Sequence, residues 1–367
     1  MILPAHSRRL RPGCGEDNFA APIRSRRRLT THPESPAATL SISVALCTYN
    51  GARFIGEQIR SICLQTLRPR EIVVSDDAST DGCVDIARRT VEECNAGHPG
   101  PPVALHVLQN ATPLRVTKNF EQAVRACQGD LIALSDQDDA WLPERLARMA
   151  AEFERRPDLL LLHTDARLVD GALTDLGQSL FHALEVEPIE LERVHGGKAF
   201  DVLLRRNLVT GATAIFRRSL LDVALPFPSE WLHDEWLGII AAAIGRVDLL
   251  EDQLIDYRQH EENQIGARRD SFIHKMRKTF GSRGDTHVKR AYKAELLLAR
   301  LLELGDRIPA PFIEKTRLKV AHQRFRAALP RSRIARWVPV SREVLTGRYN
   351  KFGRGVRGVV RDLFEAA

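Results

Sequence analysis

The chain has 367 residues, of which 44% are hydrophobic and 28% are charged, and its formal net charge is +7. This length suits one large domain with extensions or two domains, and the apolar content excludes a wholly disordered chain. The longest apolar stretch, residues 237–245, is far shorter than the ~20 residues that a membrane-spanning helix needs.

Strands and helices alternate along most of the chain. From residue 41 onward, short apolar segments alternate with segments of helical spacing, which predicts βαβ units and a parallel sheet with helices on both faces. The expected strands are residues 41–48, 71–75, 103–108, 131–135, 159–164, 208–216 and 247–250. The expected helices are residues 54–66, 84–94, 116–127, 143–156 and 234–243.

The two ends of the chain differ from this central part. Residues 1–39 are polar and rich in proline and arginine, so we expect a disordered basic tail. Residues 40–267 are the expected α/β domain, and residues 268–367 are predicted to be helical and basic.

Charge is distributed unevenly between these regions. Residues 41–267 sum to about −13 and residues 268–367 to about +16. An acidic body often holds carboxylates for a metal, and a basic end often meets anionic lipid or nucleic acid. A solvated helical face is an equally good interpretation of the basic end.

Three polar clusters follow strands, where an open α/β sheet binds its ligands. They are residues 48–51, 76–82 and 135–139. Aspartates crowded at one edge repel one another unless a cation lies between them, and hard divalent cations prefer oxygen ligands and substrate phosphates. The clusters therefore predict a Mg²⁺ or Mn²⁺ site for a phosphorylated ligand. Asp81 and Asp139 could instead cap the helices that follow them, and for Asp139 we favour that interpretation.

Other nucleotide-binding and hydrolytic motifs are absent from the sequence. It contains no G-x-x-x-x-G-K-[ST] loop, no G-x-G-x-x-G after the first strand and no G-x-S-x-G. These absences argue against a P-loop ATPase, a dinucleotide dehydrogenase and an α/β-hydrolase.

The three clusters in their full context resemble a known family. The segments VALCTYNG (residues 44–51), SDDASTDG (75–82) and SDQDDAW (135–141) are similar to those of family 2 glycosyltransferases with the GT-A fold. Bacterial rhamnosyltransferase-type members that build surface polysaccharides are the nearest in pattern. The likeness covers residues 41–265 and includes RQH at residues 258–260.

The resemblance implies a fold, an activity and a setting. The fold would be a single Rossmann-like, mostly parallel sheet flanked by helices, with the helical basic region as an extension. The activity would be metal-dependent, inverting sugar transfer from a nucleoside diphosphate sugar to a hydroxyl of a glycan or lipid-linked glycan, in surface polysaccharide or lipopolysaccharide biosynthesis. Rhamnose as the donor sugar rests on this likeness alone.

It also implies ligands for the nucleotide. Thr48 and Asn50 would line the nucleotide pocket, and one of Asp76 and Asp77 would hydrogen-bond the base. Lys118 would approach the nucleotide.

The remaining implied roles concern the metal and the proton. Asp136 would hold the ribose or a metal-bound water, and Asp138 would bind the metal. Asp234, in an acidic motif at a helix start, would be the catalytic base. His260 matches a position that sometimes adds a metal ligand, although a lone histidine is as often an ordinary surface or core residue. Trp231 and Trp236 would form an apolar wall beside Asp234, stack on a sugar or simply pack in the core.

Partners and location follow from composition. Six cysteines without a C-x-x-C pair, and no secretory signal, favour a cytoplasmic protein. Arginines mixed with apolar residues after residue 320 suit peripheral contact with the inner face of a membrane. No helix-turn-helix, zinc-finger or RNP signature supports nucleic-acid binding. An inactive sugar-nucleotide-binding protein is the main alternative, and a nucleic-acid-binding protein is the weaker one.

Overall fold

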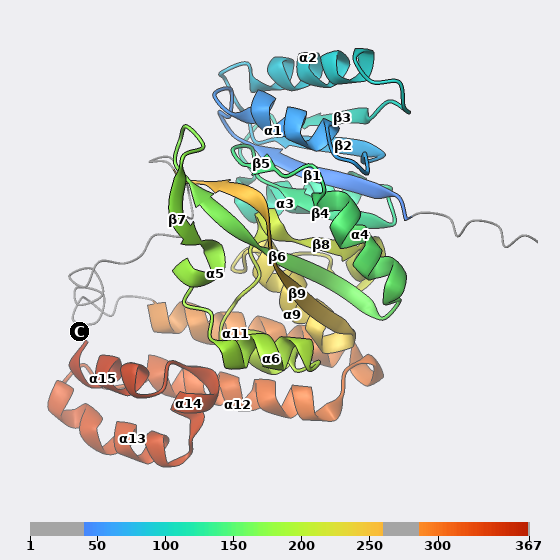
Figure 1. Cartoon of the computed structure of the whole chain (residues 1–367). Coiled ribbons are helices and arrows are strands. Elements are labelled where there is room, and N and C mark those ends of the chain that lie inside the picture. The colour runs from blue at the N-terminus through green and yellow to red at the C-terminus, as the bar shows by residue number, and fades with distance from the viewer. Residues whose placement is uncertain (1–39, 260–285, 366–367) are drawn as a thin grey trace, which may run out of the picture. The chain divides into compact units, whose positions relative to one another are not determined.

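The computed structural model describes residues 40–259 and 286–365. Its strands form one mixed sheet in the order β3-β2-β1-β4-β8-β6-β9-β5, and β7 pairs with β6 (Figure 1). The strands are β1 (Ile42–Thr48), β2 (Glu71–Asp76), β3 (Ala104–Gln109), β4 (Leu131–Ser135), β5 (Ala140–Trp141), β6 (Leu159–Val169), β7 (Asp175–Ser179), β8 (Ile215–Arg217) and β9 (Arg246–Arg258).

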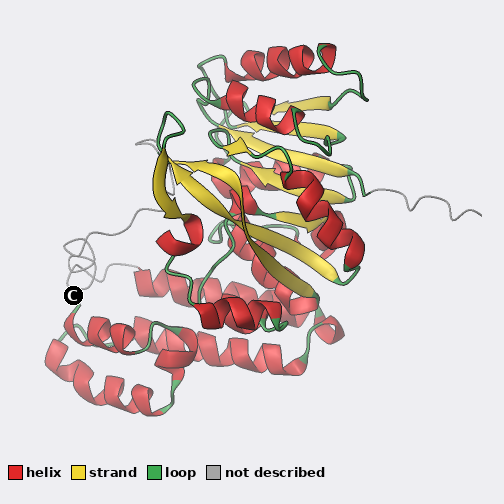
Figure 2. Cartoon of the chain, viewed as in Figure 1, coloured by secondary structure: helices red, strands yellow, loops and turns green. Residues whose placement is uncertain are grey.

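Helices cover both faces of the sheet (Figure 2). Those of the sheet-forming part are α1 (Ile55–Cys63), α2 (Cys83–Ala96), α3 (Arg115–Ala126), α4 (Arg145–Arg155), α5 (Leu180–Ala183), α6 (Pro188–His195), α7 (Ala199–Arg205), α8 (Leu221–Ala224) and α9 (His233–Ile244). Because side chains alternate along a strand, Val44 and Leu46 of β1 pack in one core with α1, α2 and α4, while Ala45 and Cys47 pack in another with α3, α7 and α9. Burial on both faces explains why these strands are continuously apolar. The expected α/β sheet flanked by helices is confirmed.

The first part of the sheet is parallel. β1 lies between β2 and β4, with Thr48 opposite Asp76 and Leu46 opposite Ser135. The segments that follow these three strands therefore leave the sheet at the same edge. This register brings the polar clusters together although 87 residues separate Thr48 from Ser135.

The second half of the sheet departs from the predicted elements. In place of a strand over residues 208–216, the chain forms a 3₁₀ turn at Gly211–Thr213 and only then enters β8. The expected strand at residues 247–250 is the start of the much longer β9, which pairs in parallel with β6. β5, β7 and α5 to α7 carry no periodicity strong enough to predict them, because they are short and rely on tertiary contacts.

The helical prediction for the C-terminal region is confirmed within residues 286–365. The helices are α11 (Thr286–Glu303), α12 (Ala310–Ala327), α13 (Arg333–Leu345), α14 (Arg348–Phe352) and α15 (Val356–Phe364). Leu297 and Leu301 of α11 share a core with α3, α7 and α9. The division at residue 267 stays a prediction. No helix in residues 40–259 and 286–365 has the length and hydropathy needed to cross a membrane.

Candidate active site

One glutamine connects the carboxyl end of β1 to the segment after β4. The Thr48 hydroxyl and the Tyr49 backbone N–H both donate to Gln137 Oε1, at 2.7 and 2.8 Å, and Gln137 Nε2 donates to the Tyr49 carbonyl at 3.2 Å. Thr48 is buried. A Cβ on Gly51 would lie 2.4 Å from Gln137 Oε1, so a larger residue there would have to displace this amide.

The segment after β2 is folded by its own aspartates. Asp76 accepts from the Ser79 N–H at 3.2 Å, and Asp77 accepts from the backbone N–H groups of Leu114 and Arg115, at 2.6 and 2.9 Å. Both carboxylates are buried. Asp77 therefore positions the start of α3, and a contact of either aspartate with a nucleotide base stays a prediction.

Neither of the two aspartates for which a capping role was the alternative is the N-cap residue of the following helix, and their contacts differ; the residue before α2 is Gly82. Asp81 accepts from the Cys83 N–H at the start of α2 and also from the Ala52 N–H at 2.7 Å. Asp139 caps no helix, because α4 begins at Arg145 after Glu144. The prediction that Asp139 is an N-cap is therefore wrong.

Asp139 is instead held by β9. Its Oδ1 accepts from the Arg258 backbone N–H at 3.0 Å, while Oδ2 is buried without a hydrogen-bond partner in the described part of the chain. The Arg258 guanidinium is buried and donates to the carbonyls of Asp138 and Gly171, both at 2.6 Å, and to Glu57 at 2.5 Å. Through these bonds Arg258 holds the backbone of the aspartate-rich segment, residues 136–139, in place.

Asp234 lies in the first turn of α9. Its Oδ2 accepts from the Gly211 N–H at 3.0 Å and its Oδ1 from the Glu235 N–H at 2.6 Å. Burial, followed by the negative charge of Glu235, raises the pKa of Asp234 to about 7, against the lowering effect of the two backbone donors. Asp234 is therefore partly ionised at neutral pH and is a stronger base than an ordinary aspartate.

The carboxylates after β4 and at the start of α9 lie close enough to interact. Burial and the charges of Asp138 and Asp234 raise the pKa of Asp136 to about 7. Tyr257 of β9 is buried beside the same group, and burial together with the charges of Asp139, Asp136, Asp138 and Asp234 raises its pKa. Carboxylates that repel one another supply the anionic oxygen ligands that Mg²⁺ or Mn²⁺ prefers, so their chemistry suits a divalent cation, and their role as its ligands stays a prediction.

The remaining predicted residues have other surroundings. Lys118 donates to Glu121 at 2.7 Å and to the Phe227 carbonyl at 2.6 Å, so a contact with nucleotide stays a prediction. His260 lies outside the described residues. Trp231 and Trp236 are buried and donate their indole N–H groups to the carbonyls of Lys293 and Ala224, which fits the core-packing alternative.

Gly211 and His233 were not predicted as site residues. His233 is buried, stacks on Phe120 with ring centroids 3.7 Å apart, and has no hydrogen-bond partner for either ring nitrogen in the described residues. Burial lowers its pKa to about 3, so the ring is neutral. A Cβ on Gly211 would lie 2.7 Å from His233 Nε2. No local pattern in the sequence marks this contact, because Gly211 reaches α9 only through the tertiary fold.

We expect Gly211→Ala to lower turnover about 10²-fold, because the added methyl group would displace the ring of His233, which stacks on Phe120, and with it the neighbouring Asp234. The overpacking should also cost about 1–3 kcal/mol in the free energy of unfolding. Steady-state kinetics and denaturant unfolding measure the two effects. Gly97→Ala, beyond α2, is the control and should change neither; equal effects of the two substitutions would contradict this account.

We expect Asp136→Asn to stabilise the metal-free protein at pH 8 by about 2 kcal/mol. The folded-state pKa of about 7 lies above the ordinary value of 3.8, so ionisation opposes folding at high pH. One pKa unit is worth ~1.36 kcal/mol, and partial exposure reduces the total. The difference should shrink as pH falls through 7 and vanish near 4, as denaturant unfolding in EDTA would show. Asp130→Asn should instead destabilise the folded protein at pH 8, because hydrogen bonds from Ser41 lower the pKa of Asp130 and favour its ionised form. A pH-independent difference would exclude this explanation.

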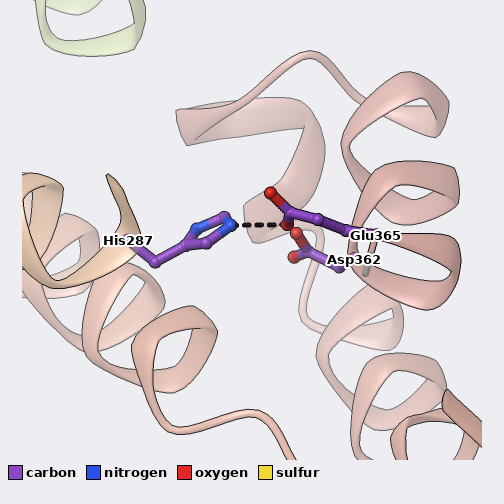
Figure 3. Close-up of side chains that lie close together, drawn as sticks. All are labelled: His287, Asp362 and Glu365. Atoms are coloured by element: carbon purple, nitrogen blue, oxygen red, sulfur yellow. Dashed lines mark hydrogen bonds and ion pairs between the residues drawn. The ribbon is translucent and has the colours of Figure 1, made fainter. Parts of the chain in front are cut away.

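A second cluster of possible metal ligands lies among the C-terminal helices (Figure 3). Atoms of His287, Asp362 and Glu365 lie within 4.8 Å of one another, and His287 Nε2 is 2.9 Å from Glu365. However, Asp362 accepts two hydrogen bonds from Arg326 and Glu365 accepts from Arg361. Burial opposes ionisation of Glu365, but the donors outweigh it and lower its pKa to about 2. Since arginines already neutralise both carboxylates, we interpret this cluster as a structural tie between α11, α12 and α15.

Comparisons with known proteins agree with this arrangement. The model for glycosyl transferase family 2 matches residues 43–223. An uncharacterized protein of Mycobacterium tuberculosis is 26% identical over 226 residues, which are 60% of this chain and 59% of that protein. An uncharacterized glycosyltransferase of Nostoc is 26% identical over 235 residues, 61% and 66% of the two chains. The chain thus spans less than two thirds of the length of these relatives.

Two solved structures share the fold. One is TarS of S. aureus in complex with UDP-GlcNAc, with a TM-score of 0.52, 19% identity and coverage of 78% of this chain and 73% of that one. The other is the mannosyltransferase PcManGT of Pyrobaculum calidifontis in complex with GDP-Man and Mn²⁺, with a TM-score of 0.51, 19% identity and coverage of 89% and 87%. With its polar clusters at one edge of the parallel strands and the family match over the same part of the chain, residues 43–223 belong to glycosyltransferase family 2, and the fold is GT-A-like.

Proposed function

We propose that the protein transfers a sugar from a nucleoside diphosphate sugar to an acceptor hydroxyl, with inversion at the anomeric carbon. One observation supports the proposal: the charges of Asp138, which follows β4, and of Asp234, in the first turn of α9, both act on the carboxylate of Asp136. Asp136 and Asp138 suit a cation that holds a diphosphate, and Asp234 suits a base.

In the proposed reaction, Asp234 takes the proton of the acceptor hydroxyl while its oxygen attacks the anomeric carbon. The bond from that carbon to the diphosphate oxygen breaks on the opposite side, which inverts the configuration. Asp234 can accept the proton because burial and Glu235 raise its pKa to about 7, while the Gly211 N–H holds the carboxylate in place. A divalent cation, when bound, would stabilise the negative charge on the departing diphosphate.

The other roles are proposals of the same kind. Asp138 would bind the cation, and Asp136 would bind the ribose or a water of the cation. Thr48 and Asn50 would line the nucleotide pocket, supported by their position at the carboxyl end of β1. Lys118 would reach the nucleotide only if it left Glu121 and the Phe227 carbonyl.

The wider setting is also proposed. The acceptor would be a glycan or a lipid-linked glycan of the cell envelope, and the donor sugar would be rhamnose. The enzyme would lie in the cytoplasm at the inner face of the membrane. The buried cysteines Cys47, Cys63, Cys83 and Cys127 are free thiols, which supports a reducing compartment.

A panel of nucleotide sugars with Mn²⁺ or Mg²⁺ tests the proposal. We expect one nucleoside diphosphate sugar to raise the unfolding temperature only with the cation, and the same donor to be hydrolysed slowly or transferred to an acceptor. Binding without any turnover of the wild-type protein would support the alternative of an inactive sugar-nucleotide-binding protein. No response to any donor would reject both.

A further inference from the structure

The C-terminal end of the described chain combines exposed apolar side chains with exposed basic side chains. Of the sixteen large apolar side chains that are exposed in the described residues, eight lie within residues 331–365. We call these eight the C-terminal apolar patch; they are Ile334, Trp337, Val338, Val344, Leu345, Val356, Val360 and Phe364. Side chains of this kind, gathered rather than scattered, mark an interaction surface.

The patch is formed by the outer faces of two helices that pack together. In α13 the buried residues are Arg336, Val340 and Glu343, and their spacing places them on one side of the helix. Ile334, Val338 and Leu345 are spaced so that they lie on the opposite side. Ile334 is 84% and Leu345 88% exposed, so this side of α13 has no partner in the described residues.

The second helix continues the same surface. Val356, Val360 and Phe364 follow one another every four residues along α15 and are all exposed. The two stripes meet where the rings of Trp337 and Phe364 make an edge contact with centroids 6.3 Å apart. Figure 1 shows α13 beside α15 at this end of the chain.

Buried polar contacts fix the orientation of α13. Arg336 is fully buried and donates to the carbonyls of Asp362 and Glu365, at 3.1 and 2.7 Å. Turning the apolar stripe inward would expose this arginine's partners and leave buried carbonyls without donors. The outward direction of the stripe is therefore part of the fold.

The exposed charges of residues 331–365 are all positive. Residues 331–365 contain three acidic side chains, Glu343, Asp362 and Glu365, and all three are buried. Six cations are exposed in this segment, Arg331, Arg333, Arg342, Lys351, Arg354 and Arg357, and of these Arg357 lies 3.6 Å from the carboxylate of Glu185. Exposed apolar side chains with basic residues beside them suit the surface of an anionic membrane, which has negatively charged head groups over an apolar interior.

We propose that the C-terminal apolar patch inserts into the interface of an anionic lipid bilayer, with the exposed cations on the lipid phosphates. A second copy of this chain fits less well, because it would bring the same exposed cations against one another. A nucleic acid would satisfy the arginines but not Ile334, Val338 and Leu345. The inference concerns a surface away from the carboxylates and does not depend on the proposed transfer reaction.

Tryptophan fluorescence can report this membrane contact without an added label. It has four tryptophans, of which Trp141, Trp231 and Trp236 are buried, and Trp337, in the patch, is 52% exposed. We expect vesicles of phosphatidylcholine with phosphatidylglycerol to shift the tryptophan emission of the full chain to shorter wavelength and to sediment the protein. Vesicles of phosphatidylcholine alone should do neither, and high salt should reverse the binding.

Substitutions separate the apolar and the ionic contributions. Ile334→Ser with Leu345→Ser should weaken partitioning onto anionic vesicles at least tenfold without affecting folding, because both side chains are exposed. Arg333→Gln with Arg342→Gln should weaken it about thirtyfold, since each basic residue near an anionic surface is worth ~1 kcal/mol. The control pair, Leu64→Ser with Leu302→Ser, removes exposed apolar side chains elsewhere and should bind like the wild type.

Three results would overturn the proposal. The first is equal binding to neutral and anionic vesicles, or to neither. The second is a lipid-free dimer that Ile334→Ser with Leu345→Ser dissociates, which would assign the patch to a second copy. The third is DNA that displaces the protein from the vesicles and protects Trp337 from quenching. None of these measurements uses a sugar donor, so they can fail while donor binding succeeds, and the reverse.

Discussion

Asp234→Asn is expected to lower sugar transfer by about 10²–10⁴-fold while donor affinity stays within about twofold of the wild type. The amide fills the same space and can still accept a hydrogen bond from Gly211 or Glu235, but it cannot take the proton of the acceptor hydroxyl. Turnover at saturating donor and donor binding by calorimetry measure the two quantities. Near-normal turnover would show that another group is the base.

Glu235→Gln is the matched control in the same turn. Its carboxylate forms an ion pair with Lys293, and its charge contributes to the raised pKa of Asp234. Removing that charge should leave turnover at high pH nearly unchanged. Because ionised Asp234 is then easier to form, the acid limb of the pH–rate profile, expected near pH 7 in the wild type, should move to lower pH. A limb that stays in place would argue against Asp234 as the titrating group.

Asp138→Ala is expected to remove both the response to divalent cations and about 10³-fold or more of the activity. A cation's stabilisation of the leaving diphosphate is worth several kcal/mol, and ~1.36 kcal/mol corresponds to tenfold in rate. Thermal shift with Mn²⁺ and nucleoside diphosphate, with and without EDTA, reports the binding, and initial rates report the catalysis. A wild-type rate that does not change in excess EDTA would exclude the metal role.

The control for this prediction is Asp81→Ala. Asp81 lies near the same edge, but its carboxylate accepts from the Ala52 and Cys83 N–H groups and holds the loop before α2. Its loss should lower the unfolding temperature yet leave the shift caused by Mn²⁺ and nucleotide in place. If Asp81→Ala abolished the Mn²⁺ response as completely as Asp138→Ala, the response would depend on loop order and not on one ligand.

Local sequence predicted the elements whose pattern is complete within one segment. β1, β2 and β4 are apolar on both faces, and α1, α3 and α4 bury one stripe each, so periodicity alone identified them within a few residues. The strand predicted at residues 208–216 failed for the opposite reason. Its apolar residues serve a 3₁₀ turn that Arg145 contacts through the Ala212 carbonyl at 2.8 Å.

The candidate site divides in the same way. The polar clusters after β1, β2 and β4 were predictable, because parallel neighbouring strands end at one edge and the motifs lie in the sequence itself. The contacts that hold those clusters in place were not predictable from the sequence. Asp139 resembles a helix cap in the sequence, yet its partner is Arg258, 119 residues later. Gly211 shows no signal at all until His233 and Asp234 are placed beside it.

The sequence by itself determined the family motifs, the alternation of strands and helices, and the basic composition of the C-terminal region. Only the tertiary structure decided that Asp234 lies near Asp136 and that burial raises both pKa values to about 7. It also decided that the acidic side chains of residues 331–365 are buried while six basic and eight large apolar side chains of the same segment are exposed. Residue identity and spacing set local propensity and side-chain direction, whereas pKa, burial and the sign of a surface depend on neighbours that are distant in the chain.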